Sequence, residues 1–352
     1  PVLPDYLLPV GLKEGDPRTN PSLYNVNPDY TDADDYNNFY RITKANKAGT
    51  DWYHEAFRPA PITSHNISVS GGGDRGNYLF SLSYFNQQGT LMNTYLKRYT
   101  IRSNSQFNIT DKIRVGENLA VSVSDNPSIE TLTSDNAVSM TYRQQPIIPV
   151  YDIRGNFAGS YGIGLGEASN PVAMQYRTRN NRGQKNRVFG NIYGEADFLK
   201  FFTFRTSFGG EVYSGWDHTF TYPTYENREN SSLNSYTENS SNGQNWTWTN
   251  TLSFHHTFNG LHDLKLLVGT EAYDERGRTL NGTTQDFFTF DPDYVDNSTG
   301  SGNQTAANTR FSNALVSLIG RLDYVFNDKY LLGATLRRDG SSPNVYSQST
   351  KH

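Results

Sequence analysis

The fold is decided by residues 65–108, HNISVSGGGDRGNYLFSLSYFNQQGTLMNTYLKRYTIRSNSQFN, whose side chains alternate between two kinds. From residue 78 to residue 84, large apolar side chains stand at the even positions and serines at two of the odd ones. The even positions are Tyr78, Phe80, Leu82 and Tyr84. A period of two residues is typical of a β-strand with two unlike faces.

A second strand of the same kind follows, in which apolar positions such as Tyr99 alternate with Arg98 and Arg102. The links GGGDRGN (71–77) and NQQGTLMN (86–93) are rich in Gly and Asn, which tolerate the positive φ that tight reversals need. The sequence therefore predicts antiparallel strands with one apolar and one polar face.

The composition favours a membrane barrel over a soluble β-sandwich. Hydrophobic residues make up only 35% of the chain and mean hydropathy is -0.69, yet aromatic residues reach 14%, with 24 Tyr and 20 Phe against 3 Met. A large soluble β-protein needs an aliphatic core, whereas a transmembrane barrel needs only a thin outer apolar band with aromatic girdles. No run of apolar residues is long enough for a membrane helix, which says nothing against membrane strands.

Ten strands are predicted along the chain. They lie near 65–71, 76–87, 94–109, 112–125, 186–198, 201–213, 245–258, 263–274, 309–326 and 329–338. Short joins alternate with long connections at 126–185, 214–244 and 275–308, which is the layout of an outer-membrane barrel. We predict an all-β fold, with about ten strands of an antiparallel transmembrane β-barrel, short periplasmic turns and long extracellular loops.

The two faces are predicted to meet two media. Trp246 and Phe258 stand at the two ends of one strand, about twelve residues apart. At about 3.3 Å for each residue and a strand tilt of about 45°, the distance between them across the membrane is about 28 Å, close to the height of the apolar band with its aromatic girdles. The predicted lipid-facing residues are Tyr78, Phe80, Leu82, Trp246, Trp248, Leu252 and Phe254. The predicted lumen-facing residues are Arg98, Arg102, Arg114, Arg205, Glu211, Lys265, Glu271, Arg321 and Arg337.

Some local features fit this scheme less simply. Glu117 falls on the apolar side of its strand, which predicts a bulge or a different register there. The acidic group Asp29, Asp32, Asp34 and Asp35 could hold calcium, but it lacks the pattern of an EF-hand, and a solvated acidic loop is the alternative. A short helical turn is expected near 39–47.

Catalytic and metal-binding motifs are weak. GIGLG (162–166) has neither the Lys-Ser/Thr pair of a phosphate loop nor a strand before it, which favours a Gly-rich surface hairpin. Adjacent strand residues point to opposite faces, so His255 and His256 cannot bind one zinc ion together with His262. There is no Cys and no nucleophile elbow. Net charge is only -4, without a basic run for nucleic acid. We expect no enzyme activity, no cofactor, no metal and no nucleic-acid partner.

Four stretches carry a resemblance to a known family. Gly49–Leu91, GTDWYHEAFRPAPITSHNISVSGGGDRGNYLFSLSYFNQQGTL, resembles the segment after the first barrel strand of SusC/RagA-type TonB-dependent transporters of Bacteroidetes. The others, in family order, are Tyr95–Asn104, PIIPVYDIRGNFAG (146–159) with NPVA (170–173), and NDKYLLGATLRRDGSS (327–342). After Ser342 the chain departs from the family pattern.

The resemblance implies a barrel of about 22 strands in the Bacteroidetes outer membrane, preceded by a signal peptide, a small N-terminal domain, a TonB box and a plug. None of these is found in this sequence, so we expect a fragment that covers the second to eleventh strands. The expected division is an extracellular loop region at 1–64 after a missing first strand, a partial barrel at 65–342 and a truncated loop at 343–352.

The resemblance also implies a function, namely import of glycan oligosaccharides or peptides. The expected partners are a SusD-like surface lipoprotein, the TonB–ExbB–ExbD complex and membrane lipid. Two alternatives remain open. One is a barrel that acts as a passive porin or adhesin. The other is a soluble β-rich carbohydrate-binding protein, whose apolar face would be buried against a second sheet.

Overall fold

The computed structural model describes most of the chain. The described residues are 2–8, 11–13, 15–17, 43–127, 135–153 and 155–346, with side chains up to residue 342. The acidic group Asp29, Asp32, Asp34 and Asp35, the residues of the expected helical turn before Thr43, and most of the terminal loop predicted at 343–352 lie outside this description.

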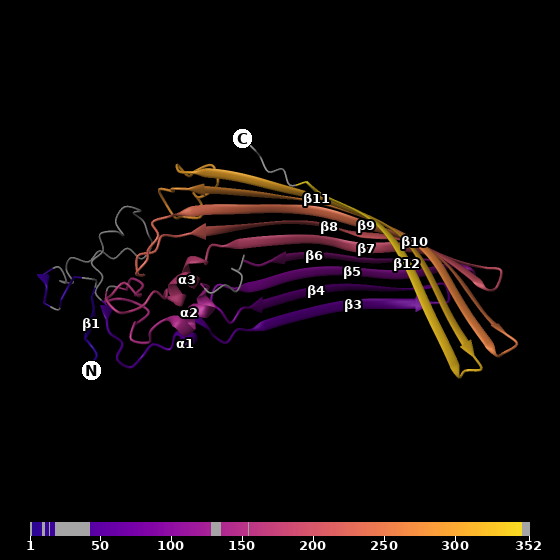
Figure 1. The fold of residues 1–352 in the computed structure, drawn as a ribbon, viewed down its shortest axis with the longest axis horizontal. Coiled ribbons are helices and arrows are strands. Elements are labelled where there is room, and N and C mark those ends of the chain that lie inside the picture. The colour runs from indigo at the N-terminus through magenta and orange to yellow at the C-terminus, as the bar shows by residue number, and fades with distance from the viewer. Residues whose placement is uncertain are drawn as a thin grey trace.

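Ten antiparallel strands form one sheet in which every strand pairs with its neighbours in sequence. The strands are β3 (Ile62–Gly73), β4 (Gly76–Gln88), β5 (Tyr95–Thr110), β6 (Ile113–Asp125), β7 (Arg182–Phe198), β8 (Phe202–Thr221), β9 (Ser235–Phe258), β10 (His262–Gln285), β11 (Gln304–Phe326) and β12 (Tyr330–Tyr346). Figure 1 shows them side by side as one curved layer. The predicted all-β architecture of ten strands is confirmed.

Several strands are longer than the sequence predicted. β8 continues to Thr221 and β9 begins at Ser235, so the loop predicted at 214–244 shrinks to 222–234. Likewise, β10 and β11 leave only 286–303 of the predicted loop 275–308. The added segments contain a few aromatic side chains, such as Trp216, Phe220 and Tyr236, among many Asn, Ser, Thr and Gly residues that are also typical of loops. Their backbones gain ladder hydrogen bonds from the neighbouring strands.

Tight turns close the hairpins at one end of the sheet. Each loop has three residues, and its first two, Leu199 and Lys200, Asn259 and Gly260, or Asn327 and Asp328, have the positive φ values of a turn that matches the strand twist. These are the three joins that the sequence predicted. Leu199 and Lys200 adopt the left-handed region without being Gly or Asn, which is a strained choice for this turn.

The connections at the opposite end build a small folded cluster. It contains the two-residue pair β1 (Tyr6–Leu7) with β2 (Thr43–Lys44) and three short helices, which Figure 1 shows near one end of the strands. The helices are α1 (Trp52–Ala56), α2 (Ala137–Arg143) and α3 (Pro171–Arg177). Their caps are Asp51, Asn136 and Asn170, whose side chains accept backbone N–H groups of the first turn.

A hydrophobic core lies in this cluster and not under the sheet. It draws on the segments before β3, between β6 and β7, between β8 and β9, and between β10 and β11. Its buried members are Leu7, Ala45, Trp52, Ile148, Val150, Phe157, Ala158, Leu165, Val172, Ala173, Tyr222, Tyr225 and Phe290. We call this part of the molecule the loop cluster.

Two predictions concern these connections. The helical turn expected near 39–47 is not found at 43–47, the described part of that range, where Thr43 and Lys44 form β2, and the first described helix begins at Trp52. GIGLG is not simply a surface hairpin, because its fourth residue, Leu165, belongs to the buried core, although Ile163 is exposed. Gly164 and Gly166 on either side have positive φ and allow the chain to turn that side chain inward.

Candidate functional site

The strand register sorts side chains into two sets across the whole sheet. Residues paired directly across neighbouring strands share a face, and the pairings continue without a change of parity from β3 to β12, apart from one irregularity beside the turn between β5 and β6. Arg102, for example, lies opposite Ser81 and Ala120, whereas Ile101 lies opposite Leu82 and Val121. We call the two sides the polar face and the apolar face.

Every residue predicted to face the lumen lies on the polar face. These residues are Arg98, Arg102, Arg114, Arg205, Glu211, Lys265, Glu271, Arg321 and Arg337. The residues predicted to face lipid, Tyr78, Phe80, Leu82, Trp246, Trp248, Leu252 and Phe254, all lie on the apolar face. The register brings each set together on one side but does not identify the medium on that side.

The apolar face is exposed in the structure. Leu82 and Trp248 are each 49% accessible and Val316 is 62% accessible. The only other sheet among the described residues is the short pair of β1 and β2, so no second sheet covers this face there. This arrangement does not support the soluble carbohydrate-binding alternative.

Glu117 lies on the apolar face without a bulge beside it, so the predicted bulge or change of register at this position was wrong. It pairs with Ser105 in regular register, and the single irregularity of this strand pair falls at Asn108 and Thr110. The Glu117 carboxylate accepts hydrogen bonds from the hydroxyls of Ser103 (2.7 Å) and Ser105 (3.1 Å). Two hydroxyl donors offset part of the cost of placing a carboxylate on this face.

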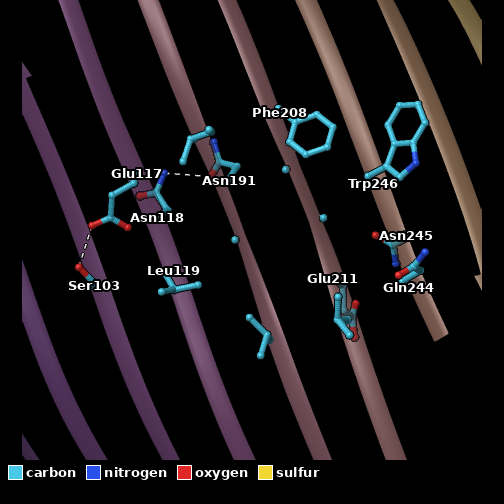
Figure 2. A pocket seen from close by; sticks show the side chains of 16 residues that line it. Ser103, Glu117, Asn118, Leu119, Asn191, Phe208, Glu211, Gln244, Asn245 and Trp246 are labelled. Carbon is cyan, nitrogen blue, oxygen red and sulfur yellow. Dashed lines mark hydrogen bonds between the residues drawn. The ribbon is translucent and has the colours of Figure 1, made fainter. Parts of the chain in front are cut away.

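A shallow hollow opens on the apolar face beside Glu117 (Figure 2). Leu119, Phe208 and Trp246 surround it. Gly190 and Gly210 also line it, and neither has a side chain to fill the space. A Cβ at either glycine would collide with the backbone oxygen of the adjacent strand. The hollow therefore reflects close strand packing, with two positions that accept no side chain.

An ion-pair network crosses the polar face near the short turns. Arg114 donates to Glu195 (3.1 Å) and to Asp197 (2.7 Å), and Arg205 donates to Glu195 (2.6 Å). The Thr203 hydroxyl donates to Asp197 at 2.7 Å. Because each carboxylate accepts from two donors, the network ties β6, β7 and β8 together.

A second group of ion pairs joins the later strands. Arg337 donates to Glu271 (2.9 Å) and to Asp339 (2.8 Å), which links β12 to β10 across β11. Arg321 pairs with Asp323 at 2.7 Å along β11. Closer to the loop cluster, Arg187 pairs with Glu211. The polar face thus carries both signs of charge, mostly in contact with each other.

The loop cluster contains a buried ion pair that sequence reasoning missed. Arg177 of α3 donates two hydrogen bonds to the Glu226 carboxylate, at 2.6 and 2.8 Å, and both side chains are buried. The guanidinium also lies 5.8 Å from the ring centres of Phe157 and Tyr225. Burial alone would raise the pKa of Glu226, but the charge and hydrogen bonds of Arg177 outweigh it and lower this pKa below its ordinary value.

Asn170 joins several segments of the same cluster. Its amide donates to the carbonyls of Val150 (2.9 Å) and Ala158 (2.8 Å), and its side-chain oxygen accepts the N–H groups of Val172 (2.9 Å) and Ala173 (3.1 Å). Every donor and acceptor of this buried amide is therefore satisfied. This arrangement explains why the PIIPVYDIRGNFAG and NPVA stretches occur together.

The histidines do not form a metal site. His255 lies on the polar face and contacts Asp263 at 2.8 Å, whereas His256 lies on the apolar face against Phe201. His262 contacts the Tyr324 hydroxyl at 2.6 Å. No group of three potential metal ligands occurs within the described ranges. In the same part of the chain, no helix combines the length and apolar character needed to cross a membrane.

Comparisons with known proteins agree with this architecture. The chain is 29% identical over 348 residues to TonB-dependent receptor P3 of Formosa agariphila, covering 95% of this chain and 34% of that protein. It is 27% identical over 329 residues to TonB-dependent receptor SusC of Bacteroides thetaiotaomicron, covering 84% of this chain and 30% of that protein. No protein-family model matches the chain.

Among solved structures, the RagAB peptide transporter aligns with a TM-score of 0.69 at 20% identity. The alignment covers 83% of this chain and 33% of that one, and it shows the shared fold. The chain therefore spans about a third of the length of the curated relatives and of the solved structure that it matches.

Proposed function

We propose that this chain is part of a TonB-dependent outer-membrane receptor of the SusC/RagA type of Bacteroidetes, a transporter and not an enzyme, and that it contributes part of the barrel wall of a nutrient importer. In this proposal the polar face lines the lumen and the apolar face contacts lipid. The wall would comprise β3 to β12, from Ile62 to Tyr346, which extends the predicted span of 65–342 by a few residues at each end, and the described residues before Ile62 would form a loop region that precedes it.

One observation supports this wall assignment most directly. The sheet is a single layer whose two faces differ in chemistry over its whole width, with exposed aromatic and aliphatic side chains on one side and ion pairs on the other. A single-layer sheet with no apolar core beneath it is stable when lipid covers its apolar side and water covers its polar side.

The imported nutrient would be a glycan oligosaccharide or a peptide, delivered with a SusD-like lipoprotein at the long-loop end. The loop cluster supports this role, because its buried core and its Arg177–Glu226 pair give a folded surface where a partner could dock. Energy would come from the TonB–ExbB–ExbD complex. A passive porin would need no such energy, which separates the two functions experimentally.

The wall assignment is tested by cysteine accessibility in intact outer membranes. These 352 residues contain no Cys, and labelling of the parent receptor without an introduced cysteine is subtracted as background. Ser253→Cys lies on the polar face of β9, and Val268→Cys lies on the apolar face of the adjacent β10. We expect a membrane-impermeant, water-soluble maleimide to label the first and not the second, with equal labelling of both after denaturation. Labelling of Val268→Cys alone would reverse the assignment.

Transport is tested separately by growth. A strain that lacks the gene should lose growth on at least one polysaccharide, oligosaccharide or peptide mixture offered as the sole carbon source. The same loss should follow from deletion of TonB. If growth depends on the gene but persists without TonB, the passive-porin alternative is correct.

A further inference from the structure

The polar face carries one group of cations that lack acidic partners. Five arginines on this face form ion pairs with carboxylates, namely Arg114, Arg187, Arg205, Arg321 and Arg337. Arg98 and Arg102 on β5 are exposed and have no ion pair with any described residue. Lys185 on β7 is likewise exposed without such a pair in the described part of the chain.

These cations flank a strand of small side chains. Arg98 lies in one row with Ser124 and Lys185, and Arg102 lies in a parallel row with Ala120. β6 runs between β5 and β7, as Figure 1 shows, and presents only Ala120, Ser122 and Ser124 to the polar face at this level. Two strand spacings place the cations of β5 and β7 roughly 10 Å apart. Four residues place Arg98 and Arg102 about 13 Å apart along β5.

Two aromatic rings lie beside the cations on the same face. The Arg98 guanidinium lies 5.6 Å from the ring centre of Phe85. Phe189, in the row of Arg102, is 56% exposed although it lies on the polar face, and the guanidinium of Arg187 is 5.9 Å from its ring centre. Exposed rings next to hydroxyls and cations provide both stacking surfaces and charge.

We propose that this cationic stretch, formed by Arg98, Arg102 and Lys185 with Phe85 and Phe189, binds acidic oligosaccharides that carry carboxylate or sulfate groups. The inference rests on the proposed function, since it requires the polar face to line the lumen. Guanidinium groups bind carboxylate and sulfate oxygens with paired hydrogen bonds, and the rings stack against sugar rings. The Ser122 and Ser124 hydroxyls between the cations are placed to meet sugar hydroxyls.

The position of the stretch favours a sugar over a peptide. β5, β6 and β7 lie inside the sheet and their backbones pair with both neighbours. An extended peptide gains much of its affinity by adding a strand to an open sheet edge, and no edge is available here. A sugar needs only side-chain partners, which this part of the polar face offers.

The test uses the receptor purified from outer membranes of a strain that carries the complete gene. Binding is measured by calorimetry with a short oligogalacturonide, a sulfated galactose oligomer, the methyl-esterified oligogalacturonide and an oligoglutamate of equal charge. The double variant Arg98→Gln/Arg102→Gln removes the charge, and Arg98→Lys/Arg102→Lys retains it. Arg321→Gln is the matched control, because it removes a cation of the same face that has an acidic partner.

We expect at least one acidic sugar to bind more tightly than the esterified sugar and the oligoglutamate, with an affinity that falls as salt rises. The Gln double variant should weaken acidic-sugar binding by about tenfold or more, the scale of one charge-assisted hydrogen bond. The Lys double variant should restore part of it, and Arg321→Gln should leave it unchanged.

Any of three results would overturn this ligand assignment. The first is that neither acidic sugar binds more tightly than the esterified sugar. The second is that the Gln double variant binds the acidic sugar as well as wild type does. The third is tighter binding of the oligoglutamate, which would assign the stretch to acidic peptides. If growth still depends on TonB in any of these cases, the proposed transport function holds and only the ligand assignment fails. Loss of all TonB dependence would instead reject the proposed function.

Discussion

The change Glu226→Gln should open the loop cluster without dissolving the sheet. The two carboxylate oxygens of Glu226 accept three hydrogen bonds, two from Arg177 and one from the Tyr225 N–H at 3.1 Å. A glutamine side chain has one oxygen, which accepts hydrogen bonds, and one NH₂ group, which only donates. In either orientation the NH₂ group would therefore point at an N–H group that also donates. The Arg177 charge would then remain buried without a counter-charge.

The size of the effect follows from this geometry. Breaking a buried ion pair by removing one partner costs about 3–5 kcal/mol. At about 1.4 kcal/mol for each factor of ten, the equilibrium between closed and open cluster should shift by roughly two to four orders of magnitude. Replacing both partners with apolar groups of similar volume, Arg177→Met with Glu226→Leu, should recover most of the loss because no charge is left buried.

Hydrogen exchange in purified outer membranes measures this shift. Backbone amides of the described residues in 144–178, the segment that ends in α3 and contributes Phe157 and other members of the buried core, should exchange faster in Glu226→Gln by a large factor, while amides in β9 and β10 should be unchanged. The double variant should exchange at close to the wild-type rate. If the double variant exchanges as fast as the single one, the buried charge is not the cause and the reasoning fails.

Acid should have the same effect as the substitution. The folded-state pKa of Glu226 is lowered, so its contribution to stability is fully present above the ordinary glutamate pKa of about 4.3. That contribution is lost as pH falls through the lowered value. We expect protection of 144–178 to be constant from neutral pH to about pH 5 and to fall at lower pH, and Glu226→Gln should not show this step. A fall between pH 7 and pH 6 would point to a different group.

Three further changes test the sheet and the cluster. Phe254→Arg places a charge on the apolar face and should cost about 2–4 kcal/mol near the membrane midplane. The loss should be visible on gels as a smaller amount of heat-modifiable, folded barrel. The control Ser253→Arg, on the polar face, should assemble normally. Gly210→Ala should destabilise the sheet by about 1–3 kcal/mol in urea unfolding, because its methyl group meets the neighbouring backbone, and an unchanged midpoint would contradict this. Asn170→Ala should raise protease cleavage of the loop cluster, since it removes a helix cap and one hydrogen bond from each of two buried carbonyls, whereas wild-type resistance would count against that role.

Much of the sheet was predictable because its determinants are local. Alternation such as Tyr78, Phe80 and Leu82 sets which side of a strand is apolar, and a one-residue shift would move every one of these side chains to the wrong face. The turn at Asn259 and Gly260 is encoded by residues that accept positive φ. For this reason the assignment of residues to two faces carried over to the observed register without exception for the predicted sets.

Local sequence patterns did not predict the full strand lengths or how the sheet accommodates Glu117. β8 ends at Thr221 and β9 begins at Ser235. Trp216, Phe220 and Tyr236 continue the alternation there, but the Asn, Ser and Thr residues around them are equally typical of a loop, so the composition hid the extent of the strands. Glu117 contradicts its strand's apolar pattern and is accommodated only because Ser103 and Ser105 on β5 face it in the observed register. That compensation depends on pairing and cannot be seen within β6.

The sequence by itself determined the period, the turns and the two faces, since each depends on residues a few positions apart. Only the tertiary structure decided the loop cluster, because Arg177 and Glu226 lie 49 residues apart and neither has a local signal for the other. The same holds for the cationic stretch, because strand pairing across β6 brings Arg98 of β5 into one row with Lys185 of β7 and Arg102 into a parallel row with Phe189. Contacts of this kind depend on the chain's path in space, since burial and charge pairing act between segments that the sequence keeps far apart.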